Sequence, residues 1–371
     1  IRSHWGQRNK TMAHDIAFDA VRNESMTFQA GQPAWHNLGQ NVEDAQTWEE
    51  AIKLANLDWK VVKAPLHTNW RNSGQVDITS HVSISRSDTQ QSLGVVGANY
   101  EIIQNDQAFE FVDALIGEHG AHYESSGGLG NGSKIWCLAR LPKDIVVGSK
   151  DILRNYLLFA TSHDGSMSAV AKLVNLRVVC HNTLTAALGE NGMQTKIKHT
   201  KNAKIRMEQA QRLMAGANSR IETLEERFNL LAQAKLSRPA LLSVLDSIFP
   251  VAPEASERSK TRRENVVVEV LTRMKSNDNN AFPEQAGSAY ALLNAITGYA
   301  DHQRTARATQ AKAGTDQSIL RAESALFGTS ADLKTKALDQ IHSMVLADGT
   351  QEIDTSNVDA MFDRTIRDSG L

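Results

Sequence analysis

The chain has 371 residues and a formal charge of −2, with 41% hydrophobic and 22% charged residues. These proportions exclude a wholly disordered chain and a collagen-like fibre, and only two cysteines, Cys137 and Cys180, exclude a disulfide scaffold. No run of 18 or more apolar residues predicts a membrane span, and no secretory signal is recognisable. The cysteine content is typical of a reducing compartment.

Composition divides the chain into two predicted regions. Residues 1–11 precede Met12, which we expect to be the natural start, so 1–11 is predicted to be a non-native leader. All six Trp lie at or before position 136, whereas the second half is rich in Ala, Leu, Gln, Glu, Lys and Arg. We therefore expect an α+β domain over 12–193 and a helical region over 194–371.

The first region mixes helical and strand patterns. Helical spacing predicts helices over 48–56, behind a Thr47 cap, and over 105–116. Strands are expected over 59–64, 76–86 (with a phase slip near Ser80), 93–97, 134–141 and 156–162. Few strands alternate with full crossover helices, so a mostly antiparallel sheet is expected.

The second region is predicted to be all-helical. Apolar residues at steps of three and four predict one long helix over about 204–234. A bundle is expected to follow, with helices over 239–249, 257–275, 284–311, 316–326, 331–347 and 355–367.

Two glycine-containing segments resemble catalytic motifs but favour turns. The stretch 127–132 (GGLGNG) would need a following helix to bind phosphate, and a strand is expected there instead. His163 and Asp164 could form half of a hydrolytic dyad, but Asp164-Gly165 between two strand patterns favours a hairpin turn. Both segments are therefore expected to connect antiparallel strands.

The cysteines and histidines indicate no metal or cofactor. Neither cysteine lies in a C-x-x-C pair, and the histidines lack H-x-x-x-H spacing. A hydrolase or nuclease that uses His163, Asp164, Cys180 and His181 stays open as an alternative, although adjacency of Cys180 and His181 says little about catalysis.

The clearest functional signal is a basic stretch between the two regions. Residues 194–212 carry six Lys or Arg against one acid, Glu208, a net charge of +5, to which a protonated His199 would add. Such a row can neutralise a phosphate backbone, although charge runs are often only solvated helix faces. We expect phosphate contacts from Lys196, Lys198, Lys201, Lys204 and Arg206, with Lys172 and Arg177 as neighbours. Two further clusters, around 258–263 and 302–312, are interpreted as solvated faces.

Several motifs together resemble the phage/plasmid-like family catalogued as a domain of unknown function. The matching stretches include 33–39 (PAWHNLG), 55–59 (ANLDW), 93–97 (LGVVG), 162–166 (SHDGS), 177–184 (RVVCHNTL) and 289–295 (AYALLNA). His181 and Tyr290 depart from the family's more frequent Gln and Trp, and both changes are conservative. The resemblance implies phage or plasmid origin in a bacterial host cell and no accepted catalytic residues.

These observations favour a binding protein over an enzyme. The leading hypothesis is a cytoplasmic protein that binds single-stranded nucleic acid, DNA rather than RNA, as a homo-oligomer without ATP or another cofactor, in strand annealing or recombination. No Walker motif is present, and annealing needs none. A self-assembling structural protein is the first alternative. No membrane association is expected.

Overall fold

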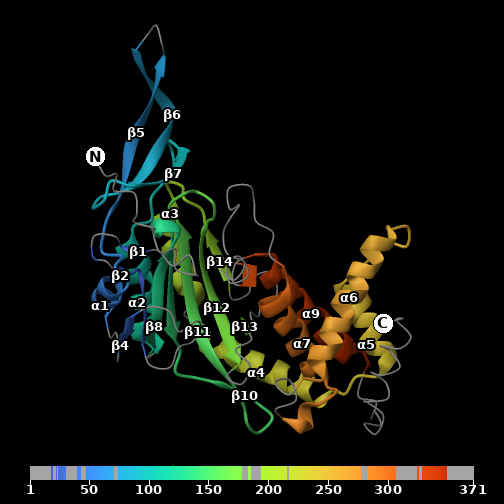
Figure 1. Cartoon of the computed structure of the whole chain (residues 1–371). Coiled ribbons are helices and arrows are strands. Elements are labelled where there is room, and N and C mark those ends of the chain that lie inside the picture. Colours follow the sequence, from blue (N-terminus) through green and yellow to red (C-terminus); the bar gives the residue numbers. More distant parts are fainter. Residues whose placement is uncertain are drawn as a thin grey trace, which may run out of the picture.

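The computed structural model describes residues 18–19, 22, 24–30, 40–42, 47–70, 74–119, 121–177, 183–184, 194–214, 217–276, 282–305, 324–325 and 328–348. The predicted leader over 1–11 and the predicted helix over 355–367 lie outside these residues. The protein combines antiparallel sheets with helices, and the sheet-rich part is mostly N-terminal (Figure 1). The expected α+β class is confirmed.

A nine-stranded sheet forms the centre of the first region. Its main order is β13-β12-β11-β9-β8-β3-β4, with β10 paired to β11 and β14 paired to β12. All these pairs are antiparallel except β3 with β4. The strands are β3 (Thr27–Ala30), β4 (Gln40–Val42), β8 (His122–Leu129), β9 (Lys134–Arg140), β10 (Ile145–Val147), β11 (Asp151–Ser162), β12 (Ala169–Arg177), β13 (Thr183–Leu184) and β14 (Gln194–Ile197). Strands β1 (Phe18–Asp19) and β2 (Glu24–Ser25) form a separate pair.

Both glycine-containing segments are hairpin connections, as predicted. The short helix η1 (Gly130–Gly132) links β8 to the antiparallel β9, and Gly132 has a φ of +89°, which a side chain would oppose. Residues 163–168 link β11 to β12, and Asp164 Oδ1 accepts a hydrogen bond from the amide of Ser166. Neither segment leads into a helix that could hold phosphate.

A long two-stranded arm projects from one end of the molecule (Figure 1). It consists of β5 (Val61–Trp70) and β6 (Gly74–Arg86), and β7 (Ser92–Gly97) pairs only with residues 81–85 of β6. The pairing passes from Pro65↔Val82 to Leu66↔Ile78, so residues 79–81 form a bulge. This bulge confirms the phase slip expected near Ser80.

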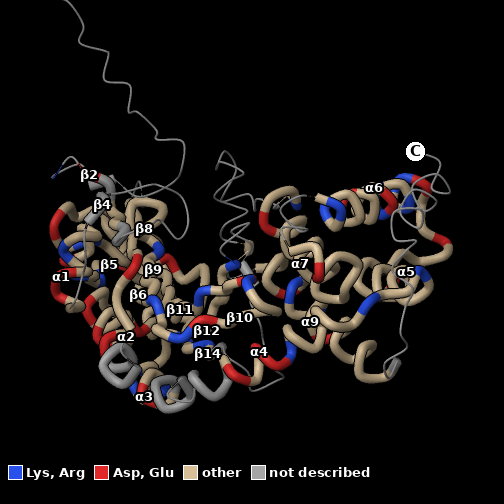
Figure 2. Tube along the Cα trace, turned by 90° about the horizontal axis from the view of Figure 1, so that it is seen from below, with Lys and Arg blue, Asp and Glu red and all other residues tan. Residues whose placement is uncertain are grey.

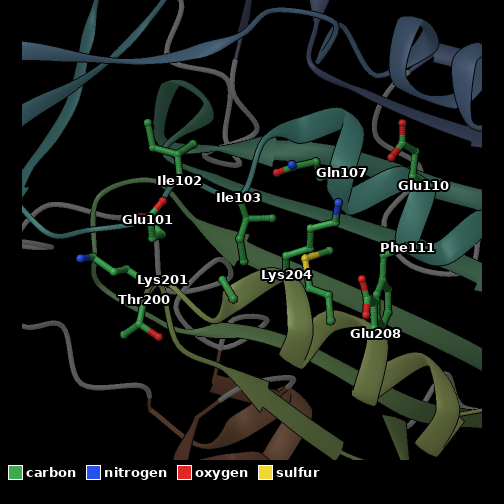
Figure 3. Close-up of a pocket in the computed structure, with 12 residues that line it drawn as sticks. Glu101, Ile102, Ile103, Gln107, Glu110, Phe111, Thr200, Lys201, Lys204 and Glu208 are labelled. Atoms are coloured by element: carbon green, nitrogen blue, oxygen red, sulfur yellow. The ribbon is translucent and has the colours of Figure 1, made fainter.

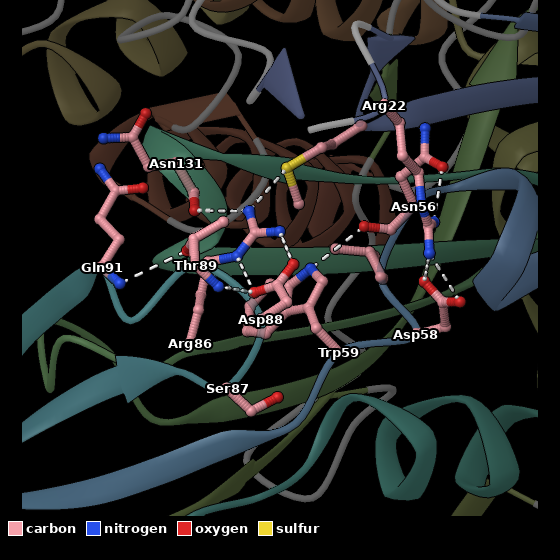
Figure 4. Close-up of polar contacts among 12 residues, drawn as sticks. Arg22, Asn56, Asp58, Trp59, Arg86, Ser87, Asp88, Thr89, Gln91 and Asn131 are labelled. Carbon is pink, nitrogen blue, oxygen red and sulfur yellow. Dashed lines mark hydrogen bonds and ion pairs between the residues drawn. The ribbon is translucent and has the colours of Figure 1, made fainter. Parts of the chain in front are cut away.

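The base of the arm is fixed by a buried arginine. Arg86 places its guanidinium 4.4 Å from the Trp59 ring centre, and its Nε and Nη2 atoms donate to the carboxylate of Asp88 (Figure 4). Burial opposes ionisation of Asp88, but the hydrogen bonds and charge of Arg86 outweigh it, so the pKa of Asp88 is lowered. Arg22 binds Asn56 and Asp58 on the neighbouring turn.

Three helices pack beside the sheet, two from the first region and one from the second. Helix α1 (Trp48–Leu54) begins with the expected Thr47 cap, completed by a capping box with Glu50. Helix α2 (Asn105–His119) and helix α3 (Ala203–Met214) follow. Phe109, Phe111 and Phe159 are buried in the core that α1 and α2 share with the sheet.

The remaining helices form a second, continuous core. They are α4 (Ala217–Gln233), α5 (Arg238–Ile248), α6 (Glu257–Met274), α7 (Ala289–Gly298), the short helices η2 (Pro283–Gln285) and η3 (Tyr299–Gln303), and α9 (Thr329–Asp348). Leu153 and Leu173 of the sheet are buried in the same core as Phe228 and Leu292 of these helices. The sheet and the helical region are therefore joined by shared apolar packing.

One expectation for the second region is wrong. Residues 194–197 form β14 because Ile197 is buried against the sheet core, and its lysines had hidden the strand alternation. Within the long helix expected over 204–234, the structure describes α3 and α4, and residues 215–216 between them lie outside the described residues. Helix α3 meets α2 and β14, and α4 meets β10 and α7.

Candidate nucleic-acid interface

Four of the predicted phosphate-contacting lysines lie together on the surface. Lys196 is in β14, Lys198 and Lys201 are in the turn that follows, and Lys204 is in the first turn of α3. All four side chains are exposed. We call these four residues the basic turn. Figure 2 shows Lys and Arg segments near β12 and β14, and β14 lies at the edge of the sheet beside β12.

The basic turn rests on a fixed base. The imidazole of His199 stacks on Tyr100, with ring centres 4.5 Å apart, and its Nδ1 donates to the carbonyl of Glu101 at 3.0 Å. The amide of Glu101 in return donates to the carbonyl of His199. Burial lowers the pKa of His199 despite the bond to Glu101, so His199 does not supply the additional charge considered in the sequence.

The lysines of the basic turn make no ion pair within the described ranges. The cluster over 258–263 differs, because Lys260 pairs with Glu257 and Arg263 with Asp246. The interpretation of that cluster as a helix face is consistent with this pairing. Of the cluster over 302–312, Arg304 donates to the carbonyl of Thr329, and Arg307 and Lys312 lie outside the described residues.

The other predicted contacts are less accessible. Arg206 is half-buried in α3. Arg177 is fully buried and pairs at 2.7 Å with Asp151, which is also fully buried. Lys172 is buried in β12, where burial and the charge of Lys334 lower its pKa to about 7. The expectation that Lys172 and Arg177 contact phosphate is therefore wrong, because neither reaches the surface.

Several family-like motifs meet at the buried His163. Asn105 donates from its amide to the carbonyls of Leu57 and Trp59, which leaves Oδ1 to accept from Nε2 of His163 at 2.9 Å. Gly94 lies so close to Asp164 that an added Cβ would be 2.7 Å from its Cα. The motifs at 55–59, 93–97 and 162–166 thus form one packed junction.

This junction does not support the hydrolytic alternative. Burial lowers the pKa of His163 to about 3, so its imidazole stays neutral at physiological pH. Its hydrogen bond goes to Asn105 and the carboxylate of Asp164 bonds the backbone of Ser166. Cys180 and His181 lie outside the described residues. No group of three or more metal-ligating side chains occurs in the described part of the chain.

A cavity of about 460 Å³ opens beside the basic turn (Figure 3). It lies between the start of α2 and α3, with Lys201 and Lys204 in its lining. Three carboxylates also line it, those of Glu101, Glu110 and Glu208. The lysines could be recognised in the sequence but the cavity could not, because Glu101 and Glu110 are far from α3 along the chain. Glu208, the one acid in the basic stretch, was the only local signal.

Comparison with known families assigns the chain to one family. The family model described as "Domain of unknown function (DUF932)" matches residues 92–326, more than half of the chain. The protein therefore belongs to this family, as its motifs indicated. No curated protein and no solved structure matches the chain. Among the described helices, none has the length and apolar character needed to cross a bilayer.

Proposed function

We propose that this protein binds single-stranded DNA through the basic turn and acts as a homo-oligomer in strand annealing or recombination. The observation that carries the proposal is the exposure of Lys196, Lys198, Lys201 and Lys204 on one short segment, without ion pairs in the described structure. Unpaired, exposed ammonium groups are free to replace the counterions of a phosphate backbone. We favour DNA over RNA because the sequence resemblance implies phage or plasmid origin.

The whole-chain charge of −2 does not oppose this proposal. The field that a strand meets is set by nearby groups, since charges beyond about 10 Å are largely screened at moderate salt. The backbone of the basic turn is anchored by two buried side chains of the same segment, those of Ile197 and Ala203. A rigid base lowers the ordering cost of binding, because only the lysine side chains need to be immobilised.

The arm supports the oligomeric part of the proposal. Beyond β7, the ribbon is only two-stranded, and such ribbons are marginally stable in water unless they pack on something. Val76 and Ile78 are 42% and 38% exposed and point to the same side of β6. A second copy that covered this side would stabilise the ribbon. The same feature also fits a self-assembling structural protein, our second candidate.

A salt titration tests the proposal. Fluorescence anisotropy with a labelled 20-nucleotide strand is expected to show binding at 50 mM salt that weakens steeply as salt rises, with a logarithmic slope of about −0.7 per phosphate contacted. Absence of binding at low salt would contradict DNA binding. Negative-stain imaging with and without the strand separates the second candidate, which predicts assembly indifferent to DNA together with no binding.

A further inference from the structure

The cavity beside the basic turn combines an apolar floor with a charged rim. Ile103, Phe111 and Ala203 form buried parts of its lining, and Met207 is half-buried there. Its volume of about 460 Å³ lies within the roughly 300–1,000 Å³ typical of small-molecule sites. Figure 3 shows Lys204 extending towards Gln107, with Glu110 on the same side of the cavity as Phe111.

The charges of the lining disfavour a phosphate inside the cavity. Three carboxylates outnumber the two ammonium groups, so an anion that entered would meet a net negative lining. A neutral, flat group that donates hydrogen bonds would instead satisfy the carboxylates and cover the apolar floor. The exocyclic amino groups of cytosine and adenine are such donors, whereas thymine carries an acceptor and a methyl group in their place.

We propose that this cavity receives one unpaired base of the bound strand, and that amino-bearing bases fit it better than thymine. This inference rests on the proposed function. The phosphates stay outside, on Lys196, Lys198 and Lys201, while the base turns inward past Lys204 towards Glu110 and Glu208. In a duplex the amino group of a base is hydrogen-bonded to its partner and the base cannot enter the cavity. The cavity therefore favours binding of single strands over duplex.

Three labelled 20-mers of equal phosphate number test the inference: oligo(dC), oligo(dT) and a strand of abasic sugars. The intact protein is expected to bind oligo(dC) about tenfold more tightly than the abasic strand, since base capture contributes on that scale. Oligo(dT) is expected between them. Equal affinity for all three would overturn base capture yet leave phosphate binding intact. Binding of none would contradict the proposed function itself, and the inference with it.

Two variants locate the effect. Met207→Trp fills the cavity without changing its charge, and is expected to lower oligo(dC) affinity to that of the abasic strand without weakening the latter. Glu110→Gln, an exposed position, should reduce the preference for oligo(dC) over oligo(dT). Glu254→Gln, an exposed position outside the cavity lining, is the matched control. A preference that survives both cavity variants would place the base elsewhere and overturn the assignment.

Discussion

Nε2 of His163 and Oδ1 of Asn105 lie 2.9 Å apart and join two segments that are 58 residues apart in the sequence. Because Asn105 uses its amide hydrogens on Leu57 and Trp59, the proton of this bond belongs to His163. Asn105 thus joins the motifs at 55–59 and 162–166, and the close packing of Gly94 on Asp164 adds the motif at 93–97. Their shared role in this structure is to fix the connection between the arm, α2 and the sheet.

The buried His163 predicts loss of stability in mild acid. Its pKa is about 3 in the folded protein, against 6.5 for an unperturbed histidine, so the unfolded chain takes up the proton first. Its contribution is therefore fully present above pH 6.5 and falls as pH is lowered towards 3. We expect urea unfolding between pH 7 and 4 to show a shallower pH dependence for His163→Gln. His67→Gln, an exposed change in the arm, should leave the dependence unaltered.

The close packing of Gly94 against Asp164 predicts a sharp difference between two glycines of β7. A Cβ at Gly94 would lie 2.7 Å from backbone, whereas a Cβ at Gly97 meets nothing within 4 Å. Gly94→Ala should lower the free energy of unfolding by about 1–3 kcal/mol, and Gly97→Ala by less than about 0.5 kcal/mol. Thermal and urea unfolding of both variants measure this. Equal effects would contradict the packing of the 93–97 and 162–166 motifs.

The buried pair of Arg177 and Asp151 predicts a stability effect without an effect on binding. Arg177→Met leaves the Asp151 carboxylate buried without its ion-pair partner and should cost about 3–5 kcal/mol. The double variant Arg177→Met/Asp151→Leu should regain most of this loss. Lys260→Gln, in an exposed pair, should cost less than about 1 kcal/mol. If the double variant folds but binds the oligonucleotide more weakly, Arg177 would instead be part of the nucleic-acid interface.

The basic turn predicts a change in salt dependence. Lys198→Gln/Lys201→Gln should weaken oligonucleotide binding and reduce the magnitude of the salt slope by about 1.4, from about 0.7 for each lost phosphate contact. The control Lys53→Gln/Lys150→Gln removes two exposed charges elsewhere and should change neither the affinity nor the salt slope. Equal losses in both double variants would show that overall charge, rather than the basic turn, determines binding.

The arm predicts a change in oligomeric state. Val76→Ser/Ile78→Ser removes the exposed apolar side chains of β6, and sedimentation velocity should then show smaller species than for the unchanged protein. Gln75→Ser/Asp77→Ser alters the alternate positions of the same strand and serves as control. Unchanged sedimentation of the first variant would remove the arm from the proposed assembly.

Local patterns predicted much of this structure, and long-range partners explain the rest. The Thr47 cap, the turn at 163–168 and the bulge near Ser80 all follow from residues close in sequence. The burial of Arg177 could not be predicted from nearby residues, since its partner Asp151 precedes it by 26 residues and Gln285 follows it by 108. Strand β14 could not be predicted either, because it is rich in polar and charged residues and its partner β12 is not its neighbour in a short hairpin.

The core shared by Leu153, Leu173 and the C-terminal helices has a consequence for how the chain can be divided. Cutting after residue 193 would expose apolar side chains on both fragments, and it would also separate β14 from β12. We expect neither fragment to stay monodisperse, whereas co-expressed fragments should reassociate. Calorimetry of the whole chain should accordingly show one cooperative transition, so that the compositional boundary marks a change of architecture inside a single folding unit.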